Sequence, residues 1–311
     1  MVGQQLVSQL IKYDSIVYVA SKDNKQLVNK KIKKFFKIDL SNLKNCIKVT
    51  KDIDIVFNLL GITGSPKINI ENPASFMMGN INLSLPLLEA SRINKVKRYL
   101  LTSTYGVYGP SKIMKEDDVW KTFPSNHDKY AGWAKRIAEL QIEAYQKEYK
   151  FEGLYIVRPG NIFGPYANFN PKNSMVVSSI IKRVVDGENP LKVWGDGKAI
   201  RDFIFSKDVA RGMLEVVKKN IQVPVNLGSG KGYSIKNLVK SICNSKFLKK
   251  KPKIIFDKSK PTGDKIRILS IERSKKLGIH KITKFQDALD ETIKWYIKNK
   301  PKTKLRFNYF K

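Results

Sequence analysis

Residues 99–110 read YLLTSTYGVYGP, and this stretch joins a strand-like apolar run to a group of hydroxyl side chains. The run at 99–101 is typical of a strand buried inside a sheet. Hydroxyl and glycine residues follow it directly at 102–106. In parallel α/β sheets, ligands bind beyond the carboxyl ends of the strands. We therefore predict a central strand here, with a functional site at its end.

Strand-like and helix-like segments alternate along the chain. Apolar runs of strand type lie at 15–20, 53–61, 96–103 and 153–157, and segments with helical periodicity lie at 2–12, 76–90 and 130–149. This alternation predicts βαβ units, and hence an α/β fold with a doubly wound parallel sheet covered by helices on both faces. Further helices are expected at 174–186, 208–220, 235–245, 270–277 and 285–298, with strands at 191–194, 224–227 and 253–256.

The chain carries 59 lysine and arginine residues against 27 acidic ones, for a net charge of +32. Such a charge is one signature of a nucleic-acid-binding protein. Most of these cations are lysines scattered along the chain, whereas base readout and bidentate phosphate contacts favour arginine. We therefore expect a solvated basic surface and no nucleic-acid partner. The positive field would still help to attract anionic substrates.

Simple counts disfavour several other classes of protein. No apolar run reaches the roughly 18 residues that a spanning helix needs, so no membrane partner is expected. Cys46 and Cys243 are the only cysteines, too few for a disulfide framework, and no metal site is predicted. The first residues lack the basic and apolar regions of a signal peptide, so a cytoplasmic location is expected.

Three residues form a candidate catalytic set for carbonyl redox chemistry: Thr104 at the strand end, and Tyr130 and Lys135 at the start of the next helix. The hydroxyl would orient the sugar or alcohol oxygen, and the phenol would move the proton. The ammonium would lower the pKa of the phenol and hold the cofactor ribose. Tyr130 and Lys135 are five residues apart, which separates side chains on a helix by about 140°. Tyr130 would therefore have to reach in from an irregular turn before the helix.

Motifs elsewhere make the chain similar to one known family. Residues 158–165 read RPGNIFGP, and VWGDG at 193–197 is followed by RDF at 201–203. The segments NFNPKNS at 168–174 and KSKPTG at 258–263 add to the likeness. With these motifs the chain resembles the extended short-chain dehydrogenase/reductases of the NAD-dependent epimerase/dehydratase family, and within that family the GDP-L-fucose synthases.

This resemblance implies a Rossmann-type fold, with a dinucleotide-binding domain in residues 1–165 and a smaller α/β substrate domain in residues 166–311 whose chain crosses back to the sheet. It also implies NADP or NAD as cofactor, a nucleotide sugar as substrate, and a homodimer. The residues that match cofactor-binding positions are Gly3, Lys22, Asp39, Leu40, Asn58, Leu59, Leu60, Asn80 and Lys135. The residues that match substrate-binding positions are Thr104, Tyr105, Asn161, Lys182, Trp194, Arg201 and Arg267. For Arg201, a structural ion pair with Asp202 or Asp208 is the alternative.

The chain departs from the family pattern near its start. The family opens with a strand and a glycine-rich turn that holds the pyrophosphate, whereas here Gly3 alone matches the last glycine of that turn. We expect the first strand and two glycines to lie upstream of Met1. Beside the adenine ribose, Lys22 would favour the 2′-phosphate of NADP, while its neighbour Asp23 would favour NAD.

Departures from the family pattern within the predicted site reduce the number of reactions that are expected. The cysteine and histidine that move protons in the fucose synthases fall on Gly106 and Met175, neither of which can act as an acid or base. The Asp-Glu pair of the 4,6-dehydratases is replaced by Tyr105-Gly106, so dehydration is not expected. If Lys135 keeps its family position, the tyrosine position is Ala131.

These residues and the resemblance together favour a nucleotide-sugar C4 oxidoreductase, either a 4-keto-6-deoxyhexose reductase or an epimerase/reductase similar to the GDP-L-fucose synthases. An NAD-dependent 4-epimerase, which oxidises and re-reduces the same carbon, is the alternative among enzymes. A binding protein with a degenerate site is an alternative of another class, because the cofactor loop is incomplete and the tyrosine is displaced.

Overall fold

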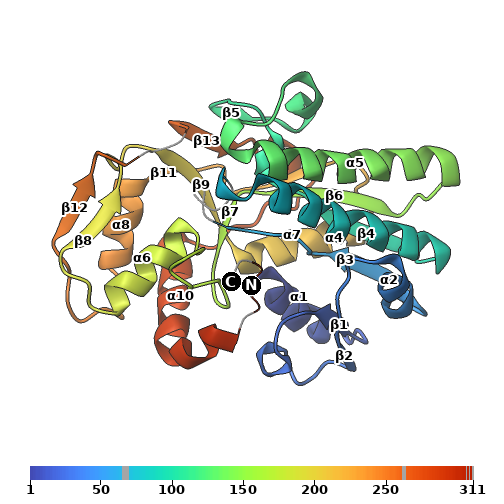
Figure 1. Ribbon diagram of the computed structural model, residues 1–311, viewed down its shortest axis with the longest axis horizontal. Helices are drawn as coiled ribbons and strands as arrows, with labels where there is room; N and C mark the ends of the chain where they lie inside the picture. The colour runs from blue at the N-terminus through green and yellow to red at the C-terminus, as the bar shows by residue number, and fades with distance from the viewer. Residues whose placement is uncertain (65–69, 261–263, 306, 308, 310–311) are drawn as a thin grey trace.

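A four-stranded parallel sheet forms the centre of the computed structural model, which describes all residues except 65–69, 261–263, 306, 308 and 310–311 (Figure 1). Its strands stand in the order β10, β6, β4, β3. They span Val225–Leu227 (β10), Leu154–Pro159 (β6), Arg98–Thr102 (β4) and Ile55–Asn58 (β3). Phe57 lies opposite Leu100, and Leu100 opposite Tyr155. The prediction of a parallel sheet in an α/β fold is confirmed.

Alternate residues of β4 face different helical layers, as a strand period of two requires. The helices that cover the sheet are α1 (Val2–Leu10), α4 (Pro73–Ile93), α5 (Lys129–Tyr149) and α7 (Ser206–Lys218). Tyr99 and Leu101 are buried with side chains of α4 and α5. Leu100 is buried with side chains of α7 instead. Burial on both faces explains why the sequence of β4 is almost continuously apolar.

Two further strands, β1 (Tyr18–Ser21) and β2 (Lys34–Lys37), form a separate parallel pair. Tyr18 lies opposite Lys34, and Figure 1 draws the pair on the β3 side of the central sheet. In the described part of the chain, β1 pairs only with β2, and β3 pairs only with β4. The parallel strands of the amino-terminal half are therefore hydrogen-bonded in two groups.

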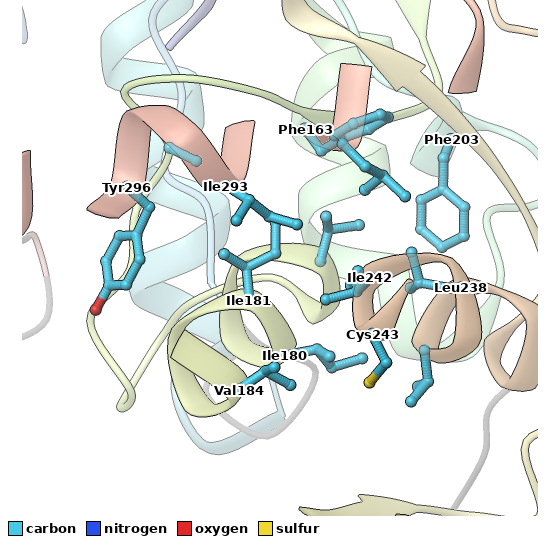
Figure 2. Close-up of a cluster of buried hydrophobic side chains, with 14 of the residues drawn as sticks. Phe163, Ile180, Ile181, Val184, Phe203, Leu238, Ile242, Cys243, Ile293 and Tyr296 are labelled. Carbon is cyan, nitrogen blue, oxygen red and sulfur yellow. The ribbon is translucent and has the colours of Figure 1, made fainter. Parts of the chain in front are cut away.

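The carboxyl-terminal half builds smaller sheets around a second core. Strand β9 (Ile200–Phe205) pairs with β7 (Asn161–Phe163), β13 (Ile266–Leu269) and β11 (Gly232–Ser234). Strand β13 also pairs with β5 (Ile113–Met114), and β8 (Leu191–Trp194) pairs with β12 (Ile254–Asp257). Besides α7, which covers the central sheet, the helices of this half are α6 (Val176–Val185), α8 (Ile235–Cys243), α9 (Glu272–Lys276) and α10 (Phe285–Asn299). Figure 2 shows buried side chains of α6, α8 and α10, among them Ile181, Ile242 and Ile293, gathered in one cluster.

The chain returns from this half to the central sheet, because Val225 of β10 lies opposite Val157 of β6. The amino-terminal half also contains α2 (Leu43–Thr50), which packs beside α4. Short 3-10 turns complete the fold: η1 (Ile11–Tyr13), η2 (Lys25–Leu27), η3 (Tyr105–Val107), η4 (Glu116–Lys121), η5 (Asn126–Asp128) and η6 (Lys300–Leu305). Of these turns, η3 and η5 flank the predicted site.

Candidate functional site

Thr104 lies just beyond the end of β4, where the sequence predicted a site. Its backbone is extended, and its hydroxyl accepts a hydrogen bond from the Gly106 amide at 3.1 Å, which caps η3. A Cβ added at Gly106 would lie 3.3 Å from the carboxyl carbon of Asp128, so a larger residue has little room there. The turn therefore fixes the Thr104 hydroxyl at the carboxyl edge of the sheet.

Lys135 is buried on α5, with 6% of its surface exposed. Its ammonium donates to the carbonyl oxygen of Leu60 at 2.9 Å and lies 3.5 Å from the Ser84 hydroxyl. Burial lowers the pKa of Lys135 to about 8, and the nearby Glu139 carboxylate opposes this shift only in part. The side chain thus connects α5 with the turn after β3, and it keeps its charge at neutral pH.

Asn58 closes β3 and holds the turn that follows. Its side chain donates to the Tyr99 phenol oxygen at 2.7 Å and accepts from the Leu60 amide at 2.9 Å. Leu59 faces the start of α1, where a Cβ added to Gly3 would meet its side chain at 3.4 Å. The structure therefore brings Gly3 and residues 58–60, all predicted to bind the cofactor, to one edge of the sheet.

Asn80 and Lys135 approach the same turn from two helices. The side-chain oxygen of Asn80, on α4, accepts from the Ile62 amide at 3.0 Å. A Cβ added to Gly61 would lie 3.4 Å from that oxygen and 3.8 Å from the Lys135 ammonium. Because Gly61 has no side chain, its backbone stays accessible between the Asn80 amide group and the Lys135 ammonium. Such a set of groups fits the ribose and amide of a nicotinamide cofactor.

Lys22 and Asp39 follow β1 and β2, and they form an ion pair at 2.6 Å. Although burial acts to raise the pKa of Asp39, hydrogen bonds from Lys22 and Ser41 lower it overall. Beside this pair, the Asp23 carboxylate accepts from the Phe307 amide at 2.8 Å, and the Lys22 ammonium lies 5.3 Å from the centre of the Phe307 ring. The carboxyl-terminal tail therefore contacts the edge at which the sequence predicted the adenine ribose.

Tyr130 lies within the first turn of α5, which begins at Lys129, and not in an irregular turn before the helix. It is 39% exposed, and its ring centre lies 5.8 Å from the Lys129 ammonium. The residue four positions before Lys135 is Ala131, which has no acidic group. The role of Tyr130 as proton donor stays a prediction, with the helical geometry against it.

Tyr105 directly follows Thr104, and its phenol reaches Asn161, another predicted substrate residue. The Tyr105 hydroxyl donates to the Asn161 side-chain oxygen at 2.8 Å, and the Arg267 guanidinium packs 4.4 Å from the ring centre. Burial raises the pKa of Tyr105, and the positive charges of Arg267 and Arg201 oppose that shift. Several predicted substrate residues therefore meet around one phenol.

Arg267 is itself held by charged and polar groups. Its side chain is almost fully buried and donates to the Asp128 carboxylate at 2.6 Å and to Nε2 of His127 at 2.8 Å. Because a guanidinium only donates, Nε2 of His127 is the acceptor in this contact. Nε of Arg267 makes no hydrogen bond within the described residues, although the Asp264 carboxylate lies 3.6 Å away.

The remaining predicted residues have other surroundings. Trp194 ends β8 and is 58% exposed. Lys182, on α6, forms an ion pair with Asp186. Leu40 is buried among side chains of α2 and α4. The ligand-binding roles of these residues stay predictions.

Arg201 lies on β9, and both carboxylates suggested as its structural partners are engaged elsewhere. Asp202 accepts hydrogen bonds from the Gly228–Gly230 loop and from β13. Asp208 forms an ion pair with Arg211 at 2.6 Å. The contact of Arg201 with substrate stays a prediction, and these partners of Asp202 and Asp208 weaken the structural alternative.

Sequence reasoning missed a buried network between α5 and the central sheet. Glu139 of α5 accepts two hydrogen bonds from Arg158 of β6, and the Ser103 hydroxyl donates to the same carboxylate. The network joins the end of β4, just beyond which Thr104 lies, to helix α5, which carries Lys135 and Tyr130. In the sequence, Arg158 directly follows the apolar run 153–157, and a charged residue in such a position needs a buried partner. The position of Arg158 was therefore the sequence signal from which a buried ion pair could have been predicted.

Two further findings concern the described residues as a whole. No group of three histidine, cysteine, aspartate or glutamate side chains is placed to hold a metal ion in this part of the chain. None of its helices is long and apolar enough to cross a membrane.

Known proteins similar to this chain are enzymes of nucleotide-sugar metabolism. GDP-mannose 3,5-epimerase from Arabidopsis thaliana is 29% identical over 215 residues, which cover 67% of this chain and 56% of that protein. GDP-L-fucose synthase from Escherichia coli (strain K12) is 26% identical over 265 residues, covering 79% of this chain and 81% of that protein. The chain thus spans little more than half the length of the first of these relatives.

Solved structures agree with the fold. UDP-N-acetylglucosamine 4-epimerase from Methanobrevibacter ruminantium M1, in complex with UDP-N-acetylmuramic acid, gives a TM-score of 0.84 at 26% identity, with 96% of each chain covered. UDP-glucose 4-epimerase from Thermus thermophilus, in complex with NAD, gives a TM-score of 0.82 at 21% identity, also with 96% of each chain covered. Residues 1–228 match the sequence profile of one family, and the resemblance found in the sequence is confirmed. The chain belongs to the NAD dependent epimerase/dehydratase family, which includes nucleotide-sugar epimerases and reductases.

Proposed function

We propose that this protein is a nucleotide-sugar oxidoreductase that reduces a 4-keto-6-deoxyhexose at C4, with GDP as the first choice of nucleotide. One observation carries the proposal: the buried Lys135 ammonium contacts the turn after β3, while Thr104 lies just beyond the end of the neighbouring strand β4. A cation that holds the cofactor ribose and a hydroxyl that orients the sugar oxygen are two of the groups that carbonyl reduction needs from the protein. The similarity to GDP-L-fucose synthase supports this choice.

NADP or NAD would supply the hydride when bound. Lys135, Asn80 and the turn after β3 would hold its nicotinamide side, and Lys22 and Asp39 its adenine side. Lys22 favours NADP, because a 2′-phosphate would accept hydrogen bonds from its ammonium once the ion pair with Asp39 opens. We further propose that residues 1–165 hold the cofactor, that residues 166–311 hold mainly the substrate, and that the protein is a homodimer.

Reduction at C4 needs fewer proton-transferring side chains than epimerisation at two carbons does. Gly106 and Met175 occupy the positions of the proton-moving cysteine and histidine of the fucose synthases, and neither side chain can transfer a proton. Asp128 fills the space beside Gly106, so position 106 has little room for a side chain that could move a proton. We therefore propose that the reaction at C4 proceeds without epimerisation by that pair of residues.

Two alternatives have observations in their favour. The likeness to the 4-epimerase of Methanobrevibacter ruminantium M1 favours a 4-epimerase that keeps its NAD bound. Ala131, at the tyrosine position, favours a binding protein without turnover.

One assay separates the three functions. The full chain is mixed with GDP-4-keto-6-deoxymannose and NADPH or NADH, and the absorbance of the reduced nicotinamide is followed. A reductase consumes one equivalent per sugar. A 4-epimerase instead interconverts UDP-sugars with no net consumption and is purified with NAD bound. Cofactor binding without turnover of any nucleotide sugar would reject both enzyme hypotheses. Lys135→Ala is the matched inactive control.

A further inference from the structure

The site has no acid at the position that the family pattern gives to its tyrosine. Ala131 stands four residues before Lys135, and the half-exposed Tyr130 lies beside Lys129. Reduction of a carbonyl must nevertheless deliver one proton to the oxygen for each hydride delivered to the carbon. Another group must therefore carry that proton, and this inference rests on the proposed function.

Most ionisable groups near the end of β4 are unsuited to giving up a proton. Asp128 is ion-paired with Arg267 at 2.6 Å, and its carboxylate oxygen accepts the hydrogen bond of that guanidinium. Nε2 of His127 lies against the same guanidinium, which can only donate, so this nitrogen acts as an acceptor there. Tyr108 is 2% exposed and donates to a buried asparagine side chain, so it belongs to the core.

Tyr105 differs from all of these groups. It follows Thr104 directly in η3, and it is only partly buried. Its hydroxyl donates to the side-chain oxygen of Asn161 at 2.8 Å, a neutral acceptor that can be exchanged for a substrate oxygen. Tyr105 is thus a protonated donor next to the hydroxyl expected to orient the sugar.

Two guanidinium groups can stabilise the negative charge that proton transfer would leave on the Tyr105 phenol. Arg267 lies 4.4 Å from the centre of the Tyr105 ring, and the charge of Arg201 also acts on this phenol. Neighbouring cations stabilise a phenolate, and Arg267 is locked in place by Asp128. These two cations therefore oppose the effect of burial on the Tyr105 pKa, and they stabilise the phenolate that proton transfer would leave.

We propose that Tyr105 is the proton donor of this site, with its phenol facing a sugar bound between Thr104 and Asn161. In the reduction, the carbonyl carbon gains a hydride from the reduced nicotinamide, which is thereby oxidised. The electron pair of the carbonyl bond takes the proton as the O–H bond of Tyr105 breaks. The phenolate regains a proton from solvent before the next turnover. Burial raises the pKa of this phenol, so the protonated form needed for reduction is present at neutral pH.

Two matched variants test the assignment, because Tyr105→Phe and Tyr130→Phe each remove one hydroxyl. We expect Tyr105→Phe to lower kcat at least about a hundredfold, a typical effect of losing a general acid, and Tyr130→Phe to lower it much less than Tyr105→Phe does. Partial rescue of Tyr105→Phe by Ala131→Tyr would support the assignment. A loss in Tyr130→Phe as large as in Tyr105→Phe, or nearly full activity of Tyr105→Phe, would overturn it.

A binding measurement keeps the test independent of turnover. Calorimetry with GDP-mannose and with GDP compares ligands with and without the sugar. We expect Tyr105→Phe to weaken binding of GDP-mannose by about two- to tenfold, the loss of one hydrogen bond, and to leave GDP unchanged. If the wild type turns over no ketosugar, the proposed function fails, and this comparison still decides whether Tyr105 faces the sugar. Equal affinities of wild type and variant for both ligands would overturn that placement. Thermal unfolding of both variants checks that they fold.

Discussion

Arg158 and Glu139 form a two-point ion pair, with N–O distances of 2.7 and 3.0 Å, between side chains that are each 2% exposed. Replacing Glu139 by Gln or Ala would leave a buried guanidinium without its counter-charge. We expect the free energy of unfolding to fall by about 3–5 kcal/mol, as measured by urea denaturation. The double variant Arg158→Met/Glu139→Leu should recover much of this loss, because it removes both charges together. A single variant as stable as the wild type would contradict this expectation.

The depressed pKa of Lys135 links stability to pH. Burial lowers the pKa to about 8 in the folded protein, whereas the unfolded chain keeps the ordinary value of 10.5. Between these values the unfolded state binds one proton more than the folded state, so the free energy of unfolding should rise with pH. The full contribution is about 3 kcal/mol. Lys135→Met should lack this rise, and the difference between the two proteins across pH 8–10.5 measures it. Parallel pH profiles for the two proteins would refute the shift.

Cofactor binding should follow the same titration in the opposite direction. Below pH 8 the Lys135 ammonium is charged and can hold the cofactor ribose, and above pH 8 it becomes neutral. We expect the Kd for NADP to increase as pH rises through about 8. Fluorescence titration of NADPH gives this profile, and Lys135→Met should bind weakly at every pH. An affinity that stays constant up to about pH 10 would show that the ammonium does not contact the cofactor.

Thr104→Val removes a hydroxyl while keeping the shape of the side chain. Because that hydroxyl is expected to orient the sugar oxygen, we expect kcat to fall by about ten- to a hundredfold. Loss of the hydrogen bond from the Gly106 amide should also cost about 1 kcal/mol of stability. Thr104→Ser keeps the hydroxyl and should retain most of the kcat and most of the stability of the wild type. Unchanged kcat in Thr104→Val would remove Thr104 from the catalytic set.

Cofactor preference should depend on Lys22. Its ammonium is paired with Asp39 at 2.6 Å and stands beside Asp23. We expect Lys22→Ala to weaken binding of NADP about tenfold more than binding of NAD, the size of one charge-assisted hydrogen bond. Asp23→Asn tests the opposite influence and should shift preference toward NADP. An unchanged ratio of the two affinities in Lys22→Ala would place the adenine ribose elsewhere.

Apolar periodicity predicted most of the regular elements. The helix expected at 130–149 is found at Lys129–Tyr149, and the strand expected at 191–194 is found at Leu191–Trp194. Strand β9 was missed because Arg201 and Asp202 interrupt its apolar pattern. Asp202 is tolerated in the core since distant amides of the Gly228–Gly230 loop satisfy its carboxylate. Partners so remote in sequence leave no local signal.

The sequence predicted the positions of single site residues well. It predicted less well the contacts between site residues that lie far apart in the chain. The position of Lys135 at the cofactor edge follows from the motif around it, and the structure places its ammonium against Leu60. The contact of Tyr105 with Asn161 and Arg267 joins segments 56 and 162 residues apart. Helix α2 was missed for a local reason: it is only eight residues long, half of them are polar, and its beginning is marked mainly by the Asn42 cap.

The division of the parallel strands into two hydrogen-bonded groups has a mechanical consequence. Lys22 and Asp39 are anchored by the β1–β2 pair, whereas Thr104 and Lys135 are anchored by the central sheet and α5. No backbone ladder sets the alignment between the two groups in the described residues. In a protein without the strand expected upstream of Met1, a dinucleotide that contacts both edges would link the two groups, and local opening of β1 and β2 would be coupled to ligand binding. Amide exchange in residues 18–21 would then slow on binding far more than exchange in β4.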